Sequence, residues 1–356
     1  MSARTLPTVK VHGSPYRRGF QHGSQCGDLI ARYADTLLQT IAQEGSWRSL
    51  RRGEDELTRE TLISRARAFL PQMVEFAPHL VEEIRGIAYG AKVPFAEALL
   101  CNVRGEVLGV ESARCTAIAA GQSATQDGQV LAGQNLDQSP LNEELQIILH
   151  VVPDKGPPML MCSFAGLVGY PGVNAEGVWF FQNAVSTNTW RANGIPHYFL
   201  KRVLLEQTRV EECLDVLARA RVCSSGNYVL GDRCNVLDVE VTPEGRAVLA
   251  PADDLVAHAN HFLSPEFAPQ DTLLPSLPDS ARRYERARAL LAARRGAITL
   301  ATLKEALADH ADYPTSICRH QDDLATISSI IAEPESGRLH VAVGNPCQNP
   351  YVTYSL

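Results

Sequence analysis

The chain has 356 residues, of which 45% are hydrophobic and 21% are charged, and its formal net charge is −7. This composition is that of an ordinary globular protein, long enough for one large domain or two modest ones. The acidic balance argues against a nucleic-acid partner, because nucleic-acid interfaces need a basic face.

The N-terminal residues lack the apolar stretch of a secretory signal, and no run approaches the roughly 18 apolar residues that a membrane span needs. We therefore expect no membrane partner. The nine cysteines are scattered and include no C-x-x-C pair, which predicts reduced thiols in a cytoplasmic protein. The histidines lack metal-ligand spacing relative to the cysteines, so no metal site is expected. His258 and His261 come nearest to a zinc pair, but they fall where a strand runs into a loop.

The first 114 residues have a helical pattern. Apolar residues recur at four-residue steps from Leu29 to Ile41, which is typical of a helix with one buried face. Pro71 separates two further helical patterns, and Pro94 suits the first turn of a last one. These further helices are predicted over residues 54–70, 73–89 and 95–108.

After residue 114, short apolar runs punctuated by Gly, Pro, Asn or Asp are typical of strands. They cover residues 115–121, 130–134, 146–152, 159–164, 167–173, 177–183, 227–231, 236–241, 255–259, 325–332, 339–343 and 351–354. Helical runs intervene at residues 197–207, 210–220, 280–293 and 300–308. Adjacent short strands without regular alternation favour antiparallel sheets with helices in outer layers, which is an α+β fold.

Cys115 opens the first of these strands and is the candidate nucleophile. A thiol that attacks an amide needs a base, donors for the developing oxyanion and a fixed geometry. An N-terminal residue can use its own α-amine, whose pKa of about 8 suits neutral pH. Because Cys115 lies inside the chain, this solution requires cleavage of the Arg114–Cys115 bond. The alternative is a buried core thiol, which is common for cysteine.

Several further segments form one ordered pattern with Cys115. They are Gly13–Gly23 (G-x-P-Y-x-x-G-x-x-H-G), Cys115–Thr116, Gln134–Asp137, Gly172–Val178, His258–Phe262, Ile317–His320, Thr326–Ile330 and Gly344–Cys347. Together they resemble the acyl-coenzyme A:6-aminopenicillanic-acid acyltransferase family of cysteine N-terminal-nucleophile hydrolases, and the resemblance covers nearly the whole chain.

The resemblance implies a four-layer αββα sandwich of two mostly antiparallel sheets between helical layers. It also implies autocatalytic cleavage between Arg114 and Cys115. Residues 1–114 would then be a helical small subunit and residues 115–356 the catalytic large subunit, and the two would stay associated as one structural domain. A homodimer is the candidate assembly. The activity implied is cleavage of a small-molecule amide through a Cys115 thioester, without metal or organic cofactor.

The resemblance also assigns roles around Cys115. Asp137 would orient the new α-amine by a charge-assisted hydrogen bond. Asn260 matches the oxyanion Asn of the family, and Asn183 matches an oxyanion Asn of the related bile-salt hydrolases and penicillin V acylases. The hydroxyl of Thr116 could assist either step.

Substrate contacts are expected from Tyr170 and from Arg283, which resembles an Arg of the same relatives. Two departures stand out. Gln134 replaces the Arg of bile-salt hydrolases, and Arg114 replaces the Gly that precedes the nucleophile of the fungal acyltransferase. The first departure turns the assignment away from bile salts, and the second places a long cation before the nucleophile, which would slow or redirect processing.

Three alternatives stay open at the level of sequence. The thioester could pass to an amine, as in an acyl-CoA-dependent N-acyltransferase of the penicillin-biosynthesis type. The scaffold could be an unprocessed, non-enzymatic binding protein. A Cys-His thiol hydrolase without cleavage would need His258 or His261 beside Cys115.

Overall fold

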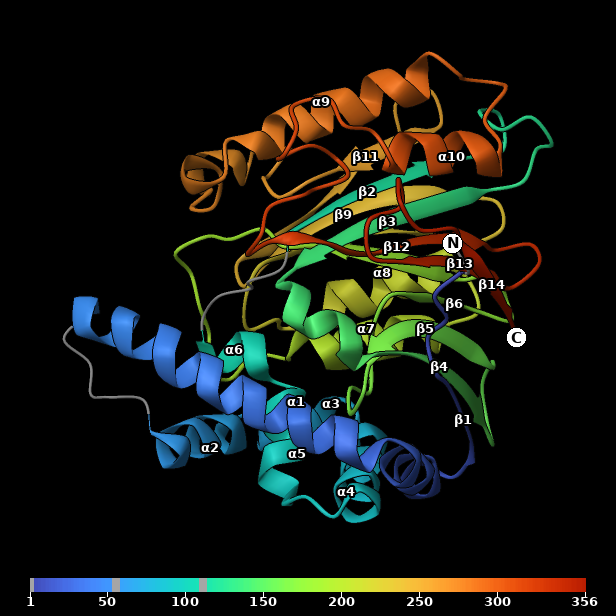
Figure 1. Cartoon of the computed structure of the whole chain (residues 1–356). Helices are drawn as coiled ribbons and strands as arrows, with labels where there is room; N and C mark the ends of the chain where they lie inside the picture. The colour runs from blue at the N-terminus through green and yellow to red at the C-terminus, as the bar shows by residue number, and fades with distance from the viewer. Residues whose placement is uncertain (1–2, 53–57, 109–113) are drawn as a thin grey trace.

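The computed structural model describes residues 3–52, 58–108 and 114–356, except for the side chains of residues 39–52. Two sheets lie face to face between two layers of helices (Figure 1). This is the α+β, αββα arrangement expected from the sequence, and that prediction is confirmed. In the described part of the chain, no helix is both long and apolar enough to cross a membrane.

The larger sheet is antiparallel except at one edge, where β1 runs parallel to β4. In spatial order its strands are β1 (Thr8–Gly13), β4 (Gln146–Pro153), β5 (Met159–Phe164), β6 (Gly172–Asn174), β7 (Trp179–Asn183), β8 (Gly226–Gly231), β9 (Val236–Thr242) and β10 (Gly245–Leu249).

The smaller sheet is antiparallel throughout and contains Cys115. In spatial order its strands are β11 (Leu255–His258), β2 (Arg114–Ala120), β3 (Leu131–Gln138), β12 (Ala325–Glu333), β13 (Arg338–Val343) and β14 (Val352–Ser355).

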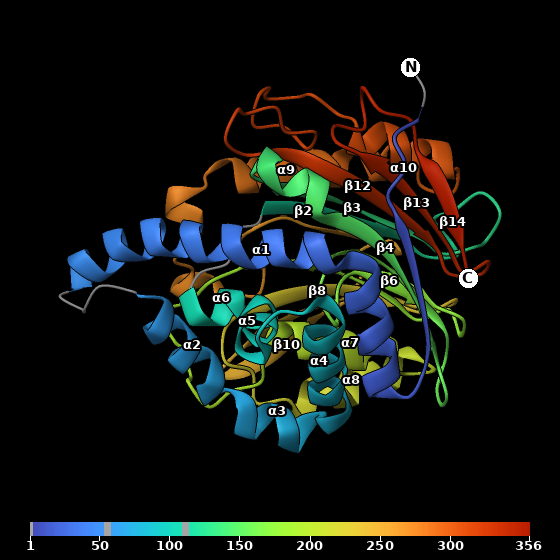
Figure 2. The ribbon, with the colours of Figure 1, turned by 60° about the horizontal axis from the view of Figure 1, so that its bottom comes forward.

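Helices form the two outer layers (Figures 1 and 2). The layer on the larger sheet contains α1 (Pro15–Arg52), α2 (Arg59–Ala68), α3 (Leu70–Phe76), α4 (Pro78–Ala91), α5 (Phe95–Cys101), α6 (Arg104–Leu108), α7 (His197–Leu205) and α8 (Val210–Arg219). The layer on the smaller sheet contains α9 (Asp279–Ala292) and α10 (Leu300–Leu307). Short 3₁₀ turns lie at Pro140–Leu145, Ala268–Gln270 and Leu274–Ser276.

Three apolar cores lie between the four layers. Alternate residues of a strand face different cores, because successive side chains of a strand point to opposite faces. In the larger sheet, Ile148 and Leu160 pack between the sheets, whereas Leu149 and Met161 face the N-terminal helices. Since both faces of each sheet are buried, the strands read as continuous apolar runs in the sequence.

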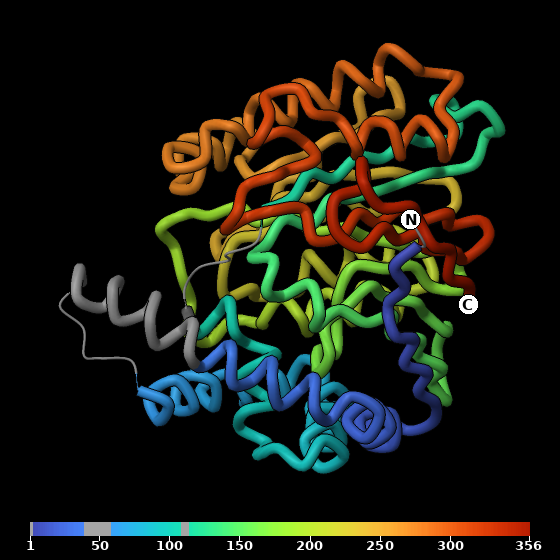
Figure 3. The backbone as a smooth tube through the Cα atoms, in the orientation of Figure 1, coloured from blue at the N-terminus to red at the C-terminus, as the bar shows by residue number. Residues whose placement is uncertain are grey.

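The N-terminal segment contributes one strand to the larger sheet, and its helices cover the outer face of that sheet (Figure 3). The strand β1 precedes α1 and pairs with β4 over its whole length, from Thr8 opposite Ile148 to Gly13 opposite Pro153. The sequence analysis did not predict this strand, although its buried Val9 and Val11 alternate with exposed residues. Segment 1–114 is therefore hydrogen-bonded into the sheet formed by the rest of the chain.

The glycines of the opening motif allow two helices to approach closely. A Cβ on Gly19 of α1 would collide with the carbonyl of Glu83 in α4, and one on Gly86 would collide with the carbonyl of Tyr16. Only glycine permits this backbone approach. Arg18 of the same motif pairs with the buried Glu83 at 2.8 Å, so the motif anchors α1 on α4.

Helix boundaries differ from the sequence-based expectation in three places. The predicted helix 95–108 is two helices, α5 and α6. Pro71 does not separate two long helices but lies in the first turn of the short α3, where its missing N–H has no cost. The next break falls at Ala77, directly before Pro78 at the start of α4. The predicted strand 167–173 is mostly irregular loop, and only residues 172–174 pair as a strand.

Candidate active site around Cys115

Cys115 is the second residue of β2, and it lies opposite Leu136 of β3. Its side chain is only 2% exposed. Two side chains from outside the sheet bind its main chain. The Cys115 N–H donates to Asn260 Oδ1 at 3.0 Å, and Arg283 Nη1 donates to the Cys115 carbonyl at 2.7 Å. The backbone of Cys115 is thus fixed from both sides.

Asn260 lies directly after β11 and has one defined amide orientation. Its Oδ1 accepts hydrogen bonds from Cys115 N and from Arg283 Nη2, the latter at 2.9 Å. Its Nδ2 donates to the Ala184 carbonyl at 3.0 Å. Reversing the amide would point hydrogens at both donors, so these contacts fix which end faces Cys115. The oxygen of Asn260 therefore binds the nitrogen of Cys115.

Arg283 comes from α9 and is 2% exposed. Besides the contacts with Cys115 and Asn260, its Nη1 donates to Thr116 Oγ1 at 2.8 Å and its Nε donates to Asp279 Oδ2 at 3.0 Å. The sequence analysis expected a substrate contact from Arg283. The structure gives it four partners within the protein, and it positions the start of β2 through charge-assisted hydrogen bonds.

Asp137 lies on β3, directly opposite Arg114 in the ladder between β2 and β3. Its Oδ1 accepts a hydrogen bond from Thr326 Oγ1 at 2.7 Å, and its Oδ2 lies 3.5 Å from Arg319 Nε. Its side chain is fully buried, and burial raises the pKa of Asp137 from 3.8 to about 6 against the opposing effects of Arg283, Arg319 and Thr326. Asp137 Oδ2 receives no hydrogen bond from the described part of the chain.

A second buried carboxylate, Asp279, joins the two guanidinium groups of the site. Its Oδ2 accepts hydrogen bonds from both Arg283 and Arg319. Burial alone would raise the pKa of Asp279, but the two arginines outweigh it and the pKa is lowered. The sequence analysis missed Arg319, Thr326 and Asp279 as members of the site. Two of them stand inside the segments Ile317–His320 and Thr326–Ile330 that carry the family resemblance, which was the available signal.

Asn183 ends β7 and faces the smaller sheet across the space between the sheets. Its Oδ1 lies 3.4 Å from Gln134 Nε2 of β3, and its Nδ2 donates to the His258 carbonyl at 3.0 Å. Gln134 also donates to the Gln182 carbonyl at 2.7 Å. Asn183 therefore links both sheets and binds the last residue of β11, two residues before Asn260.

Thr116 and Tyr170 lie on different sides of the smaller sheet. Thr116 is fully buried and binds Arg283 of the α9 layer. Tyr170 belongs to the core on the other side of the site, where its ring meets Phe164 edge to face at 5.3 Å. Gln138, the residue after Asp137, lies 3.5 Å from the Tyr170 hydroxyl and accepts from Asn142 Nδ2 at 3.1 Å. Tyr170 is thus joined to the far end of the Asp137 strand.

His258 and His261 have partners of their own. Both ring nitrogens of His258 are engaged, Nε2 with Glu240 Oε1 at 3.1 Å and Nδ1 with the Ala259 carbonyl at 2.9 Å. His261 Nδ1 binds Ser280 Oγ at 2.8 Å, and burial lowers the pKa of His261 to about 4. Because His258 uses both nitrogens, the pair does not form a zinc site.

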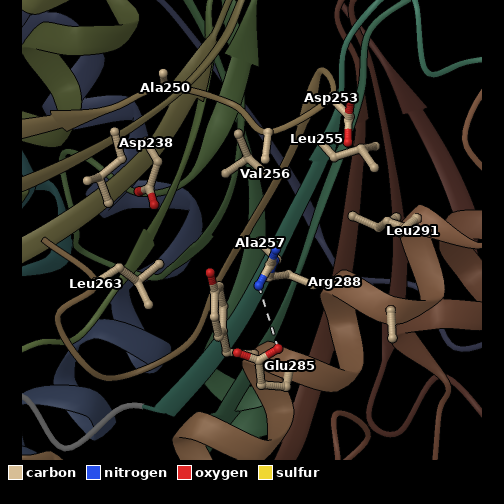
Figure 4. Close-up of a pocket in the computed structure, with 15 residues that line it drawn as sticks. Asp238, Ala250, Asp253, Leu255, Val256, Ala257, Leu263, Glu285, Arg288 and Leu291 are labelled. Atoms are coloured by element: carbon tan, nitrogen blue, oxygen red, sulfur yellow. Dashed lines mark ion pairs between the residues drawn. The ribbon is translucent and has the colours of Figure 1, made fainter.

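A cavity of about 510 Å³ borders the other side of α9 (Figure 4). Its walls include Val256 and Ala257 of β11 and the ion pair of Arg288 with Glu285, whose atoms lie 3.6 Å apart. None of the predicted catalytic residues lines it. The helix α9 therefore contributes Arg283 to the site and other side chains to this separate cavity.

The model of the family "Acyl-coenzyme A:6-aminopenicillanic acid acyl-transferase" matches residues 123–348. The 40 kDa form of acyl-coenzyme A:6-aminopenicillanic-acid-acyltransferase from Emericella nidulans is 28% identical, with 97% of this chain and 94% of the relative covered. The beta-alanyl-dopamine/carcinine hydrolase of Drosophila melanogaster is 25% identical, with 67% of this chain and 66% of the relative covered.

Solved structures were compared as well. A variant of the conjugated bile acid hydrolase from Clostridium perfringens has a TM-score of 0.49 at 17% identity, with 68% of this chain and 97% of that chain covered. The Caenorhabditis elegans ortholog of N-acylethanolamine-hydrolyzing acid amidase has a TM-score of 0.46 at 18% identity, with 68% and 100% covered. Since the family model matches more than half of its residues, this chain is an enzyme of the acyl-coenzyme A:6-aminopenicillanic acid acyl-transferase family.

Proposed function

We propose that the protein is a cysteine N-terminal-nucleophile amidohydrolase. It cuts its own chain between Arg114 and Cys115 and then cleaves a small-molecule amide through a Cys115 thioester. The observation that carries the proposal is the convergence of Asn260 and Arg283 on the main chain of Cys115, with a buried carboxylate opposite the residue before it. A core thiol has no need of such contacts. The named hydrolase and acyltransferase among the relatives support amide chemistry.

Self-cleavage begins with attack of the Cys115 sulfur on the Arg114 carbonyl carbon. The C–N bond breaks, the thiol proton passes to the nitrogen, and a thioester forms that water hydrolyses to the Arg114 carboxylate and the free thiol. The nitrogen of Cys115 already binds Asn260 Oδ1, and an α-amine at this place would keep that hydrogen bond. Asp137, whose Oδ2 lacks a hydrogen-bond donor in the described chain, would be the counterion of the new ammonium.

Turnover repeats the chemistry on a substrate. The α-amine takes the thiol proton, and the thiolate attacks the carbonyl carbon of the substrate amide. The leaving amine departs with that proton, and the acyl group stays on sulfur. Water then attacks the thioester and gives a proton to the α-amine, so the acid leaves and the thiol is restored.

Asn260 and Asn183 are our candidates for the oxyanion donors. Each uses Nδ2 toward a main-chain carbonyl, Ala184 for Asn260 and His258 for Asn183. A carboxamide nitrogen carries two hydrogens, so the second hydrogen of each would serve the oxyanion. We assign a second role to Asn260, whose oxygen would orient the nitrogen that acts as base; the hydrogen bond from Cys115 N to Asn260 Oδ1 supports it.

The two fragments, residues 1–114 and 115–356, are proposed to remain one domain after cleavage. The pairing of β1 with β4 supports this, as does the apolar core shared by the N-terminal helices and the larger sheet. Neither depends on the bond between Arg114 and Cys115.

Acyl transfer is the second candidate function. The near full-length similarity to the Emericella acyltransferase favours it. The thioester is common to both reactions, and they differ in whether water or an amine attacks it. Supplying an acyl amide with and without an acceptor amine, and analysing the products, separates them: free acid alone means hydrolysis, and a new amide means transfer.

Denaturing mass spectrometry of the purified protein tests self-cleavage. We expect two fragments, the larger beginning at Cys115, that elute together under native conditions. The reason is that cleavage creates the α-amine on which the mechanism depends. A single intact chain that still turns over amides would exclude the N-terminal amine as base.

Replacing Asn260 by Ala is expected to slow turnover by roughly 10²–10³-fold, as loss of an oxyanion donor does in other enzymes. Thermal unfolding should show that the variant folds, and kcat and KM on an acyl amide measure the effect. Asn193→Ala, at an exposed Asn, is the matched control and should keep the wild-type rate. A wild-type kcat for Asn260→Ala would remove both proposed roles.

A further inference from the structure

Four side chains that the proposed reaction does not use converge between two loops of the smaller sheet layer. His310, Cys318 and His320 come from the connection between α10 and β12, and Cys347 comes from the connection between β13 and β14. The four potential ligand atoms all lie within 4.8 Å of one another. Cys318 and His320 are two residues apart, but Cys347 follows His320 by 27 residues. The set therefore matches no compact ligand spacing, and no metal site was expected from the sequence.

Four of the six distances within this cluster fit the edges of one tetrahedron, and the two between His310 and the sulfurs lie within 4.8 Å. The two sulfurs are 3.7 Å apart, each sulfur is 3.4 Å from His320 Nε2, and the two Nε2 atoms are 3.0 Å apart. Zinc bonds of about 2.3 Å to sulfur and about 2.0 Å to nitrogen give tetrahedral edges of about 3.8, 3.5 and 3.3 Å for the same pairs. Every observed edge agrees within a few tenths of an ångström.

We propose that His310, Cys318, His320 and Cys347 bind one structural Zn²⁺ ion. Two thiolates and two imidazoles are a common donor set of structural zinc sites, and thiolate ligands select zinc over magnesium or calcium. All four positions are taken by the protein, so the ion has no open position for a substrate. His310 and Cys347 are exposed, which gives the ion an entry path.

The proposed ion would position a residue of the active site. Arg319 stands between the ligands Cys318 and His320, and its side chain pairs with Asp137 and Asp279. From the other loop, Asn345 Nδ2 donates to the Arg319 carbonyl at 2.7 Å and lies 3.5 Å from Cys318 Sγ. A metal bound to the residues on both sides of Arg319 fixes the main chain from which its guanidinium reaches the site. Arg319 is thereby a positioning residue whose own position depends on the metal.

The first test is the metal content of the full-length protein, purified without a His tag or chelators. Elemental analysis should find about one zinc per chain. His310→Ala and Cys347→Ser, both at exposed ligands, should each lower bound zinc at least tenfold after dialysis against a weak chelator. Cys234→Ser removes an exposed cysteine outside the cluster and should keep the full content. Replacement of zinc by Co²⁺ should give the visible spectrum of a tetrahedral ion with thiolate charge-transfer bands.

Several results would overturn the site. They are zinc below about one tenth of an equivalent in wild-type protein even after incubation with ZnCl₂ under reducing conditions, equal zinc in wild type and both ligand variants, and a Cys318–Cys347 disulfide in protein freshly purified under reducing conditions. The zinc content and the disulfide test of the wild-type protein need no variant. A variant that fails to fold therefore cannot obscure the result. Chelation with dipicolinate should also lower the Tm of wild type but not of Cys347→Ser; an equal response would count against a structural ion. Fragment masses in the same samples report on Cys115 separately.

Discussion

Cys115→Ala should leave the chain intact at 38.8 kDa and abolish turnover of amide substrates. The substitution removes the only atom that we assign to attack both the Arg114 carbonyl and the substrate. The same sulfur is assigned to self-cleavage and to substrate turnover, so both reactions should be lost together. Intact mass and an assay of acyl-amide hydrolysis measure them independently. The loss in rate should reach the assay limit, since removal of a nucleophile commonly costs several orders of magnitude.

Two further variants make this experiment decisive. Cys234→Ala removes an exposed thiol and should process and turn over like wild type. Cys115→Ser keeps a weaker nucleophile and should be cleaved slowly. Turnover by Cys115→Ala would refute the nucleophile, whereas normal cleavage of Cys115→Ala without turnover would show that another group cuts the chain.

Asp137→Asn is expected to lower kcat by about 10²–10⁴-fold, the range for loss of support to a catalytic base. The amide keeps the shape of the carboxyl group but cannot carry the charge that we assign to the α-ammonium. The wild-type rate should increase as pH rises through about 6, because the carboxyl group must be ionised to act. Asp137→Asn should lack this step in its pH profile.

The same carboxyl group gives a stability signature with a defined sign. Its pKa in the folded chain is about 6, above the ordinary 3.8, so the folded state binds the proton more tightly. Its contribution to the free energy of unfolding is full below pH 4 and is lost as pH rises to about 6. Urea titrations of uncleaved Cys115→Ala at several pH values should show this loss, and the Cys115→Ala, Asp137→Asn double variant should not. Equal pH dependence in both would place the raised pKa elsewhere.

The local pattern of apolar and polar residues was sufficient to predict much of the fold. The amphipathic run 280–293 and the apolar run 146–152 match α9 and β4 to within one residue, because burial of one face or of both faces leaves a clear period in the sequence. The predicted strand 167–173 was wrong because most of its apolar residues are buried in a loop, where hydrophobicity does not indicate strand pairing. The strand β1 was missed although Val9 and Val11 alternate with exposed residues, because its partner β4 lies far along the chain and no turn signal marks the pair.

Only part of the candidate active site was predicted from the sequence. Cys115, Asp137 and Asn260 belong to segments that a family resemblance can identify, and the structure brings all three to the start of β2. The buried ion network of Arg283, Asp279 and Arg319 joins helix α9 to a loop forty residues later, and no local period records such a contact. The Cys and His cluster was missed for the same reason, because its four residues follow no regular spacing in the sequence.

The pairing of β1 with β4 has a consequence for how this protein can be produced. A catalytic fragment of residues 115–356 made alone would present the bare edge of β4, with its N–H and carbonyl groups unpaired, and the apolar outer face of the larger sheet. Such edges recruit other chains and promote aggregation. The N-terminal segment thus acts as a built-in folding partner of the catalytic fragment. Mixing separately expressed halves is a poor substitute for one continuous chain that is cut only after it has folded.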